Sequence, residues 1–350
     1  MDIISLNYTD LRFKTAEKIK KYLALSDNNR ITIGLFDSGR FYVFGNPKEE
    51  KSLIYDIGSV SKTITAHLIL KLFEEEKLDI NSTVDKYLDL KKGRYPTVYQ
   101  LLTHTAGYHH LTPVEVTLPR LTVGGYARKN PYECCTVETV IKSLERRRFL
   151  KQKVRYGYSD FAYAILAAVA EKVANKPFWS LLEEFANKNW GLENTVIIAD
   201  PKNRTPLAAC GKKILPFWVW KKENPYIAGG GMVSNIEDML RYIALQIESD
   251  KPYISLAHTV CKNSELRGDN HLMCIGWHTY RRSNQLWHVG GVGTFRTSVI
   301  INKKRKLGVV VLGNAKGKAS ANAHYIAKML YSELKNKRIK LKTGVAYEKS

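Results

Sequence analysis

Long apolar runs are absent from this chain of 350 residues, and so is a leader-like N-terminus. No stretch reaches the run of about eighteen apolar residues that a membrane-spanning helix needs. The opening segment, MDIISLNYTDLRFK, has an acidic second residue and lacks the basic, apolar and small-residue order of a secretion signal. We therefore expect no membrane span and a cytoplasmic location.

Paired cysteine spacing is absent as well. The five cysteines are odd in number and none forms a Cys-x-x-Cys pattern: Cys134, Cys135, Cys210, Cys261 and Cys274. Such a set is typical of free thiols in a reducing compartment rather than of a disulfide framework.

Motifs for metals and nucleotides are incomplete. His104, His109 and His110 in HTAGYHH lack carboxylate or cysteine partners at metal-binding spacing, and we expect His104 to make a structural hydrogen bond where a helix turns into a loop. The segment GNAKGK (313–318) is one residue short of a phosphate-binding loop and has no Ser or Thr after its lysine. We therefore expect neither a metal nor a cofactor.

Acidic residues are scarce relative to basic ones. There are 33 Asp and Glu against 55 Lys and Arg, which gives a formal net charge of +22. The basic residues are spread along the chain, with short clusters only at 145–148, 303–306 and 335–342. The sequence contains no recognised nucleic-acid-binding motif, so we expect a solvated basic surface and no specific nucleic-acid partner. The alternative, nucleic-acid association, predicts binding that falls steeply as the salt concentration rises.

The order of expected elements indicates the fold class. A helix is expected at 14–25, and RITIGLFDSGRFYVFG (30–45) predicts a β-hairpin around Asp37-Ser38-Gly39. The pattern is mainly helical from about 75 to 225. Strand-like segments and a closing amphipathic helix then follow: MCIGWHTYRR, QLWHVGG, FRTSVIINKKR, KLGVVVLGNA and SANAHYIAKMLYSELKNK. No repeating strand–helix–strand alternation occurs, so we predict an α+β fold with a largely antiparallel sheet flanked by helices.

These boundaries predict one domain over residues 1–338. Its sheet is expected from residues 1–75 and 226–338, with a mainly helical insertion at 76–225, and 339–350 reads as a polar tail.

The segment YDIGSVSKTITAHLIL (55–70) places Ser59 and Lys62 three residues apart at the start of an apolar helix. This spacing brings the ammonium near the hydroxyl and partly out of water. The setting at a helix N-terminus favours developing negative charge on the serine. Two alternatives stand beside this: Ser59 is only a helix cap, and the same spacing recurs at Ser332 and Lys335 on a solvated helix face.

Two further segments carry candidate site residues. In RYGYSDFAYAIL, we expect an ammonium near the Tyr158 phenol to lower the pKa of that phenol, so that Tyr158 acts as a base toward a serine. Asp160 is expected to hold the ammonium in place. The alternative is that Tyr158 is a structural tyrosine. In QLWHVGGVGTF, His288 precedes Gly290 and Gly291, whose bare backbone allows close approach and offers N–H groups to an oxyanion. The alternative is a β-bulge with a surface histidine.

Five segments together, in this order and spacing, resemble the serine β-lactamase-related family of class C β-lactamases, penicillin-binding proteins and esterases: YDIGSVSKT, LLTHTAGY, YGYSDFAYAIL, PYIAGGGMVSNIEDMLRY and WHVGGVGTF. The resemblance covers roughly residues 14–335. It implies a β-lactamase-like antiparallel sheet flanked by helices, with a helical subdomain and the active site between them.

The resemblance also implies residue roles. Ser59 is then the nucleophile, Lys62 its partner and Tyr158 the proton-transferring group, with an oxyanion hole from the N–H groups of Ser59 and Gly291. His288, with Gly290 two residues later, matches the family's third motif. The literal Lys-Thr-Gly at 342–344 follows the closing helix and has no strand to occupy.

Two positions depart from the β-lactamases of this group. Asp160 stands where they have asparagine, and His288 where they have lysine, so the site loses a fixed positive charge. This disfavours a carboxylate-bearing β-lactam as the natural substrate. A free substrate amine is a possible partner for Asp160, and Lys62 is the nearer one.

We therefore predict a serine hydrolase that forms an acyl-enzyme on an ester or amide bond of a small molecule or short peptide, as an esterase or D-amino-acid peptidase does. The alternatives are penicillin-binding or β-lactamase activity, and a non-catalytic relative that acts as a binding protein. The oligomeric state stays open.

Overall fold

The computed structural model describes residues 1–24, 29–44, 53–108, 130–147, 156–197, 218–261, 270–315, 322–339 and 341. Expectations for His109, His110, Cys210 and the Lys-Thr-Gly at 342–344 lie outside these ranges, as do most of the 107–135 loop and of the polar tail. The main strands are β1 (Ile3–Leu6), β2 (Arg30–Asp37), β3 (Arg40–Phe44), β6 (His271–Met273), β7 (His278–Tyr280), β8 (Leu286–Val292), β9 (Phe295–Asn302) and β10 (Leu307–Asn314). A separate two-stranded pair joins β4 (Tyr55–Asp56) to β5 (Val233–Ser234).

The helices that frame the sheet and the site are α1 (Phe13–Ala24), α3 (Ser61–Glu74), α4 (Val98–Leu102), α6 (Val137–Arg146), α7 (Asp160–Ala174), α8 (Phe178–Glu184), α9 (Ile227–Gly230), α10 (Ile236–Glu248), α11 (Pro252–Ala257) and α12 (Ala323–Lys335). Short 3-10 turns include η2 (Gly58–Val60), which leads directly into α3. Within the described residues, no helix has both the length and the apolar character to cross a membrane.

The main sheet joins the two ends of the chain. Its strand order is β1-β3-β2-β10-β9-β8-β7-β6, with β2 from the N-terminal part paired to β10 from the C-terminal part. The predicted hairpin is confirmed, because β2 and β3 are joined by Ser38 and Gly39, which both have positive φ, as a two-residue turn of this kind requires. Strand β1 was not predicted, and it pairs with β3 in parallel, so the sheet is mixed rather than wholly antiparallel.

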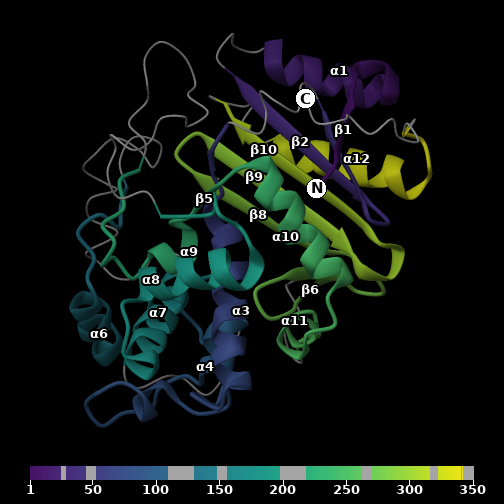
Figure 1. Ribbon diagram of the computed structural model, residues 1–350. Helices are drawn as coiled ribbons and strands as arrows, with labels where there is room; N and C mark the ends of the chain where they lie inside the picture. The colour runs from purple at the N-terminus through teal and green to yellow at the C-terminus, as the bar shows by residue number, and fades with distance from the viewer. Residues whose placement is uncertain are drawn as a thin grey trace.

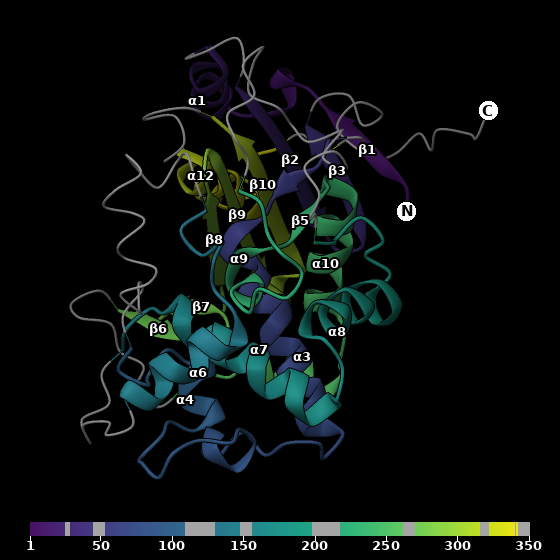
Figure 2. The same cartoon turned by 90° about the vertical axis from the view of Figure 1, so that its left-hand side faces the viewer.

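Helices cover both faces of this sheet (Figures 1 and 2). In β10, Val309 and Val311 pack toward α12, while Val310 and Leu312 join the core on the opposite side, which α10 covers. A strand buried on both faces reads as a continuous apolar run rather than an alternating one. The α+β architecture expected from the sequence is confirmed.

A group of helices lies below the sheet around α3 (Figure 2). Helix α3 contacts α7, α9 and α11, and most of its side chains are buried. A helix that is apolar on all sides must be enclosed by protein. The N-terminal end of α3 lies beside β8, where the helical layer and the sheet meet.

Helix α12 offers a matched test of this packing. Ile326 is fully buried against the sheet, while its neighbour Tyr325 is 54% exposed and contacts Lys18. We expect Ile326→Ala to lower the free energy of unfolding by about 2–5 kcal/mol through lost burial and a cavity. Tyr325→Ala is expected to change it by less than about 1 kcal/mol. Urea unfolding of both variants measures this, and equal losses contradict the assigned orientation of α12.

Candidate active site

Ser59 lies in η2, where the backbone turns sharply into α3. Gly58 has a φ of +52°, and a Cβ at this position would lie 2.6 Å from the amide nitrogen of Gly291. Glycine is therefore needed at residue 58 both for its conformation and for the approach of β8. The cap of α3 is Val60 and that of η2 is Ile57, so Ser59 does not serve as the helix cap that was the alternative interpretation.

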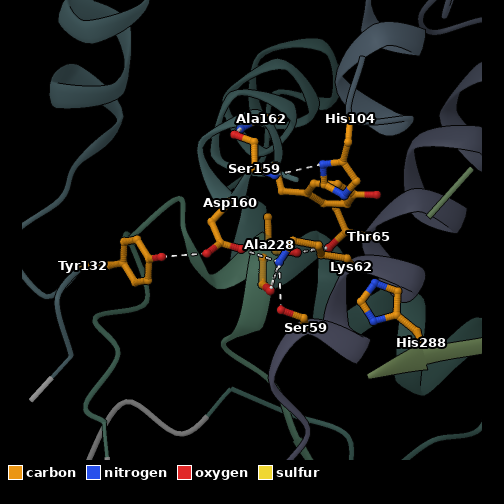
Figure 3. Close-up of polar contacts among 12 residues, drawn as sticks. Ser59, Lys62, Thr65, His104, Tyr132, Ser159, Asp160, Ala162, Ala228 and His288 are labelled. Carbon is orange, nitrogen blue, oxygen red and sulfur yellow. Dashed lines mark hydrogen bonds and ion pairs between the residues drawn. The ribbon is translucent and has the colours of Figure 1, made fainter. Parts of the chain in front are cut away.

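Lys62 is fully buried and points its ammonium group at Ser59 (Figure 3). Its Nζ donates to Ser59 Oγ at 3.1 Å, to Asp160 Oδ1 at 2.5 Å and to the Gly229 carbonyl at 2.6 Å. Three oxygen acceptors match the three donors of an ammonium group. Lys62 is therefore a buried ammonium group whose three N–H groups all donate hydrogen bonds.

Asp160 is the partner that compensates this charge. It is the first residue of α7, is 6% exposed and forms an ion pair with Lys62. The second carboxylate oxygen accepts from the hydroxyl of Tyr132 at 2.6 Å. Of the two partners weighed for Asp160 from sequence, Lys62 is the one that the structure brings into contact.

The start of α7 is itself held in place by its neighbours. The Ser159 hydroxyl caps the helix by accepting from the Ala162 N–H, and the Ser159 N–H donates to His104 Nδ1 at 3.2 Å (Figure 3). His104 follows α4 with a φ of +57°. The structural hydrogen bond predicted for His104 is confirmed, and it fixes the turn that carries Tyr158 and Asp160.

Tyr132 was missed by the sequence analysis. It lies just before α6, stacks on Tyr226 at 4.4 Å between ring centres, and is parallel to Trp220 at 6.2 Å. The Asn224 side chain donates to the Tyr132 carbonyl, so the backbone is held as well. Nothing in local spacing links Tyr132 to Asp160, since the contact spans 28 residues.

Tyr158 lines the cavity beside Ser59, and its ring centre is 4.9 Å from Lys62 Nζ. Desolvation by the surrounding protein raises the pKa of Tyr158 well above its usual value, and the Asp160 carboxylate raises it further. The hydrogen bond with Ser59 acts in the opposite direction but is the smallest of the three effects. The predicted lowering of this pKa is therefore wrong, because desolvation by burial, and then the Asp160 carboxylate, disfavour the phenolate.

His288 is 1% exposed, so the alternative of a surface histidine is wrong. Burial first, and then the charge of Lys62, lower the pKa of His288 to about 3, which leaves the imidazole neutral near pH 7. Its Nδ1 lies 2.8 Å from the Val289 carbonyl, a contact that requires the proton on Nδ1. Nε2 is then the lone-pair nitrogen, and it has no hydrogen-bond partner in the described part of the chain.

The glycines of β8 allow close approach, although to the protein's own backbone. A Cβ on Gly290 would lie 1.9 Å from the Ile57 carbonyl oxygen, whereas one on Gly291 would meet only the Arg296 side chain at 3.5 Å. The amide nitrogen of Gly291 thus lies against η2, which carries the N–H of Ser59.

A cavity of about 610 Å³ opens beside Ser59. It is lined by Ser59, Tyr158, His278, Trp287, His288, Val289, Gly290, Gly291, Arg296, Thr297, Ala323 and His324. Asp160, although described, is not part of this wall, since it lies behind Lys62. Its predicted role in contacting substrate directly does not fit this placement.

No group of three or more histidine, cysteine or acidic side chains suited to a metal ion occurs within the described ranges. The histidines of the cavity wall are instead neutral neighbours of aromatic rings. Burial lowers the pKa of His278 well below its usual value and that of His324 to about 4. Arg296 is then a cation on this wall, and its Nη1 donates to the carbonyls of Gly293 and Phe295.

Comparison with known proteins agrees with this geometry. The sequence model of the Beta-lactamase family matches residues 40–331, so the chain belongs to that family. It is 25% identical over 297 residues to Protein flp of Staphylococcus aureus (strain COL), an alignment that covers 79% of this chain and 54% of that protein. The chain spans about half the length of the curated relatives it matches.

Solved structures show the same fold. A penicillin-binding protein homologue from Pyrococcus abyssi, described as octameric, superposes with a TM-score of 0.71 at 23% identity, covering 93% of this chain and 78% of that one. A β-lactamase/D-alanine carboxypeptidase from Yersinia pestis, complexed with citrate, superposes with a TM-score of 0.71 at 16% identity. The superposition covers 92% of this chain and 98% of that one. The β-lactamase-like fold predicted from the sequence motifs is confirmed.

The adjacent glycines of β8 give a matched test of the contact with η2. We expect Gly290→Ala to lower the free energy of unfolding by about 1–3 kcal/mol, because its Cβ overlaps a backbone carbonyl that must shift. Gly291→Ala, whose Cβ meets only a flexible side chain, is expected to stay within about 1 kcal/mol of the parent. Guanidinium unfolding compares the two, and equal effects contradict the close approach at Gly290.

Proposed function

We propose that this chain is a serine hydrolase that cleaves an ester or amide bond through an acyl-enzyme on Ser59. The observation that carries the proposal is the hydrogen bond from the fully buried Lys62 to a serine hydroxyl that opens on a cavity. A buried lysine in contact with a serine is a recurrent way to activate that serine for attack. Membership of the Beta-lactamase family supports the same chemistry.

The reaction takes place in two acyl-transfer steps. Ser59 Oγ attacks the carbonyl carbon, and the resulting oxyanion accepts hydrogen bonds from the N–H groups of Ser59 and Gly291, which η2 and β8 bring together. Tyr158, a neutral phenol hydrogen-bonded to Ser59, orients the nucleophile and delivers a proton to the leaving group. Water then attacks the acyl-enzyme and releases the acid.

The charges closest to Ser59 favour an ester or a short peptide over a carboxylate-bearing lactam, while Arg296 is a cation on the cavity wall. The Lys62 charge is matched by Asp160, and His288 is neutral where an ammonium would attract a carboxylate. We therefore propose esterase or D-amino-acid peptidase activity. Penicillin binding is the second candidate, and the fold shared with the penicillin-binding protein homologue from Pyrococcus abyssi supports it.

Covalent labelling tests the nucleophile. We expect the intact mass of the parent protein to rise by one phosphonyl group with a fluorophosphonate, and this adduct to disappear in Ser59→Ala. The matched control is Ser61→Ala, two residues along the same turn, where the hydroxyl accepts from the Met232 N–H instead of contacting Lys62. Ser61→Ala is expected to label.

The same experiment with a penicillin separates the candidates. A lasting penicilloyl adduct on Ser59 would support the penicillin-binding role, and its absence would support esterase or peptidase activity. Labelling by neither reagent contradicts the proposed hydrolase and favours a non-catalytic binding protein.

A further inference from the structure

A line of hydrogen bonds leads from Ser59 away from the cavity into the protein. It runs from Ser59 Oγ to Lys62 Nζ at 3.1 Å, from Nζ to Asp160 Oδ1 at 2.5 Å, and from Asp160 Oδ2 to Tyr132 Oη at 2.6 Å (Figure 3). All the side chains beyond Ser59 are at least nine-tenths buried. The line therefore leads into the interior, to the hydroxyl of a tyrosine whose ring is stacked on other aromatic rings.

The groups beside Ser59 leave few acceptors for the serine proton. Lys62 uses its three N–H groups as donors and offers no lone pair while charged. Ionising Tyr158 is opposed by desolvation and by Asp160. Within the described residues, neither ring nitrogen of His288 hydrogen-bonds to Ser59 or Lys62, because Nδ1 contacts the Val289 carbonyl and Nε2 has no partner. Among the described side chains in contact with Lys62, the Asp160 carboxylate is the remaining base.

We propose that Asp160 is the final acceptor of the Ser59 proton, that Lys62 relays it, and that Tyr132 positions the carboxylate. This inference rests on the proposed acyl transfer and names the proton path within it. It differs from a site in which an uncharged asparagine holds the lysine, because an amide accepts a hydrogen bond but does not take up the proton.

The proposed step conserves atoms and charge. A proton passes from Lys62 Nζ to Asp160 Oδ1, and the amine then takes the hydroxyl proton of Ser59 as Oγ bonds to the carbonyl carbon. The carbonyl π electron pair moves to the oxygen, which the two backbone N–H groups hold. Lys62 is an ammonium before and after, so one negative charge has moved from the buried carboxylate to the oxyanion. The proton returns to the leaving group through Lys62 and Tyr158.

Charged and titratable groups reach Asp160 from three sides. Lys62 faces it from α3, Tyr132 from the segment before α6, and Tyr158 from the turn that precedes α7. Backbone from α9 completes the enclosure, since a Cβ on Gly229 would lie 3.5 Å from Asp160 Oδ1 and 3.3 Å from Lys62 Nζ. The backbone at Gly229 therefore lies close to both side chains and restricts how far Lys62 Nζ and Asp160 Oδ1 can move apart.

Asp160→Asn is the sharpest test, because an asparagine still accepts a hydrogen bond from Lys62. We expect the rate of fluorophosphonate labelling at pH 7 to fall by about 10²- to 10⁴-fold. The remaining rate is expected to rise with pH, since the serine proton must then be taken up by base from solvent. A rate equal to that of the parent, or a loss that is the same at every pH, overturns the relay.

Tyr132→Phe tests the positioning role without removing the carboxylate. Loss of a donor to the charged carboxylate makes its protonation easier, so the acid limb of the labelling rate is expected to move to higher pH by about one unit. The matched control is Tyr163→Phe, a tyrosine of α7 whose hydroxyl donates to the Leu102 carbonyl. It is expected to keep the parent's profile. An unchanged acid limb in Tyr132→Phe overturns the assignment of Tyr132, even if Asp160→Asn fails to fold.

The outcomes separate this inference from the proposed function. Labelling of the parent at Ser59, together with an unaffected Asp160→Asn, retains the hydrolase and rejects the relay. Absence of labelling in the parent rejects both.

Discussion

The buried ion pair between Lys62 and Asp160 is the constraint on which the rest of the site depends. A lysine with no exposed surface requires a compensating charge and full hydrogen bonding, because an unpaired buried charge is strongly destabilising. The pair brings together the start of α3 and the start of α7, and the Gly229 carbonyl ties α9 to the same ammonium.

This pair also sets the charge that Tyr158 and His288 experience. Desolvation and the Asp160 carboxylate together outweigh the hydrogen bond with Ser59, and the pKa of Tyr158 is raised. His288 stays neutral because it is desolvated and faces the same ammonium. Next to Ser59 the neutral phenol, the neutral imidazole and the paired lysine carry little net charge, and the cation on the cavity wall is Arg296. The absence of a lysine ammonium at residue 288 is the physical basis for proposing an ester or a peptide rather than a carboxylate-bearing lactam as substrate.

The sequence predicts features that depend on short spacing. The contact between Ser59 and Lys62 follows from a separation of three residues on a helix, and the hairpin at Ser38 and Gly39 follows from turn chemistry. Strand β1 was missed because four residues carry little pattern, and its partner β3 lies nearly forty residues later.

Features that depend on distant packing were not predicted. The hydroxyl of Tyr132 reaches Asp160 through stacking with Tyr226 and Trp220, three segments that only the fold brings together. The direction of the Tyr158 pKa shift depends on how desolvation and the Asp160 carboxylate compare with the hydrogen bond from Ser59, and residue types alone do not supply that balance. The glycine at residue 290 was expected to let a ligand approach the backbone closely. The structure shows instead that the group in close contact with Gly290 is the carbonyl of Ile57.

The most direct test of this account is a crystal structure of the fluorophosphonate adduct. We expect phosphorus bonded to Ser59 Oγ, with the phosphonyl oxygen within hydrogen-bonding distance of the N–H groups of both Ser59 and Gly291. We also expect Lys62 still to contact Asp160. An adduct on another residue, or a phosphonyl oxygen directed away from these two N–H groups, would contradict this account.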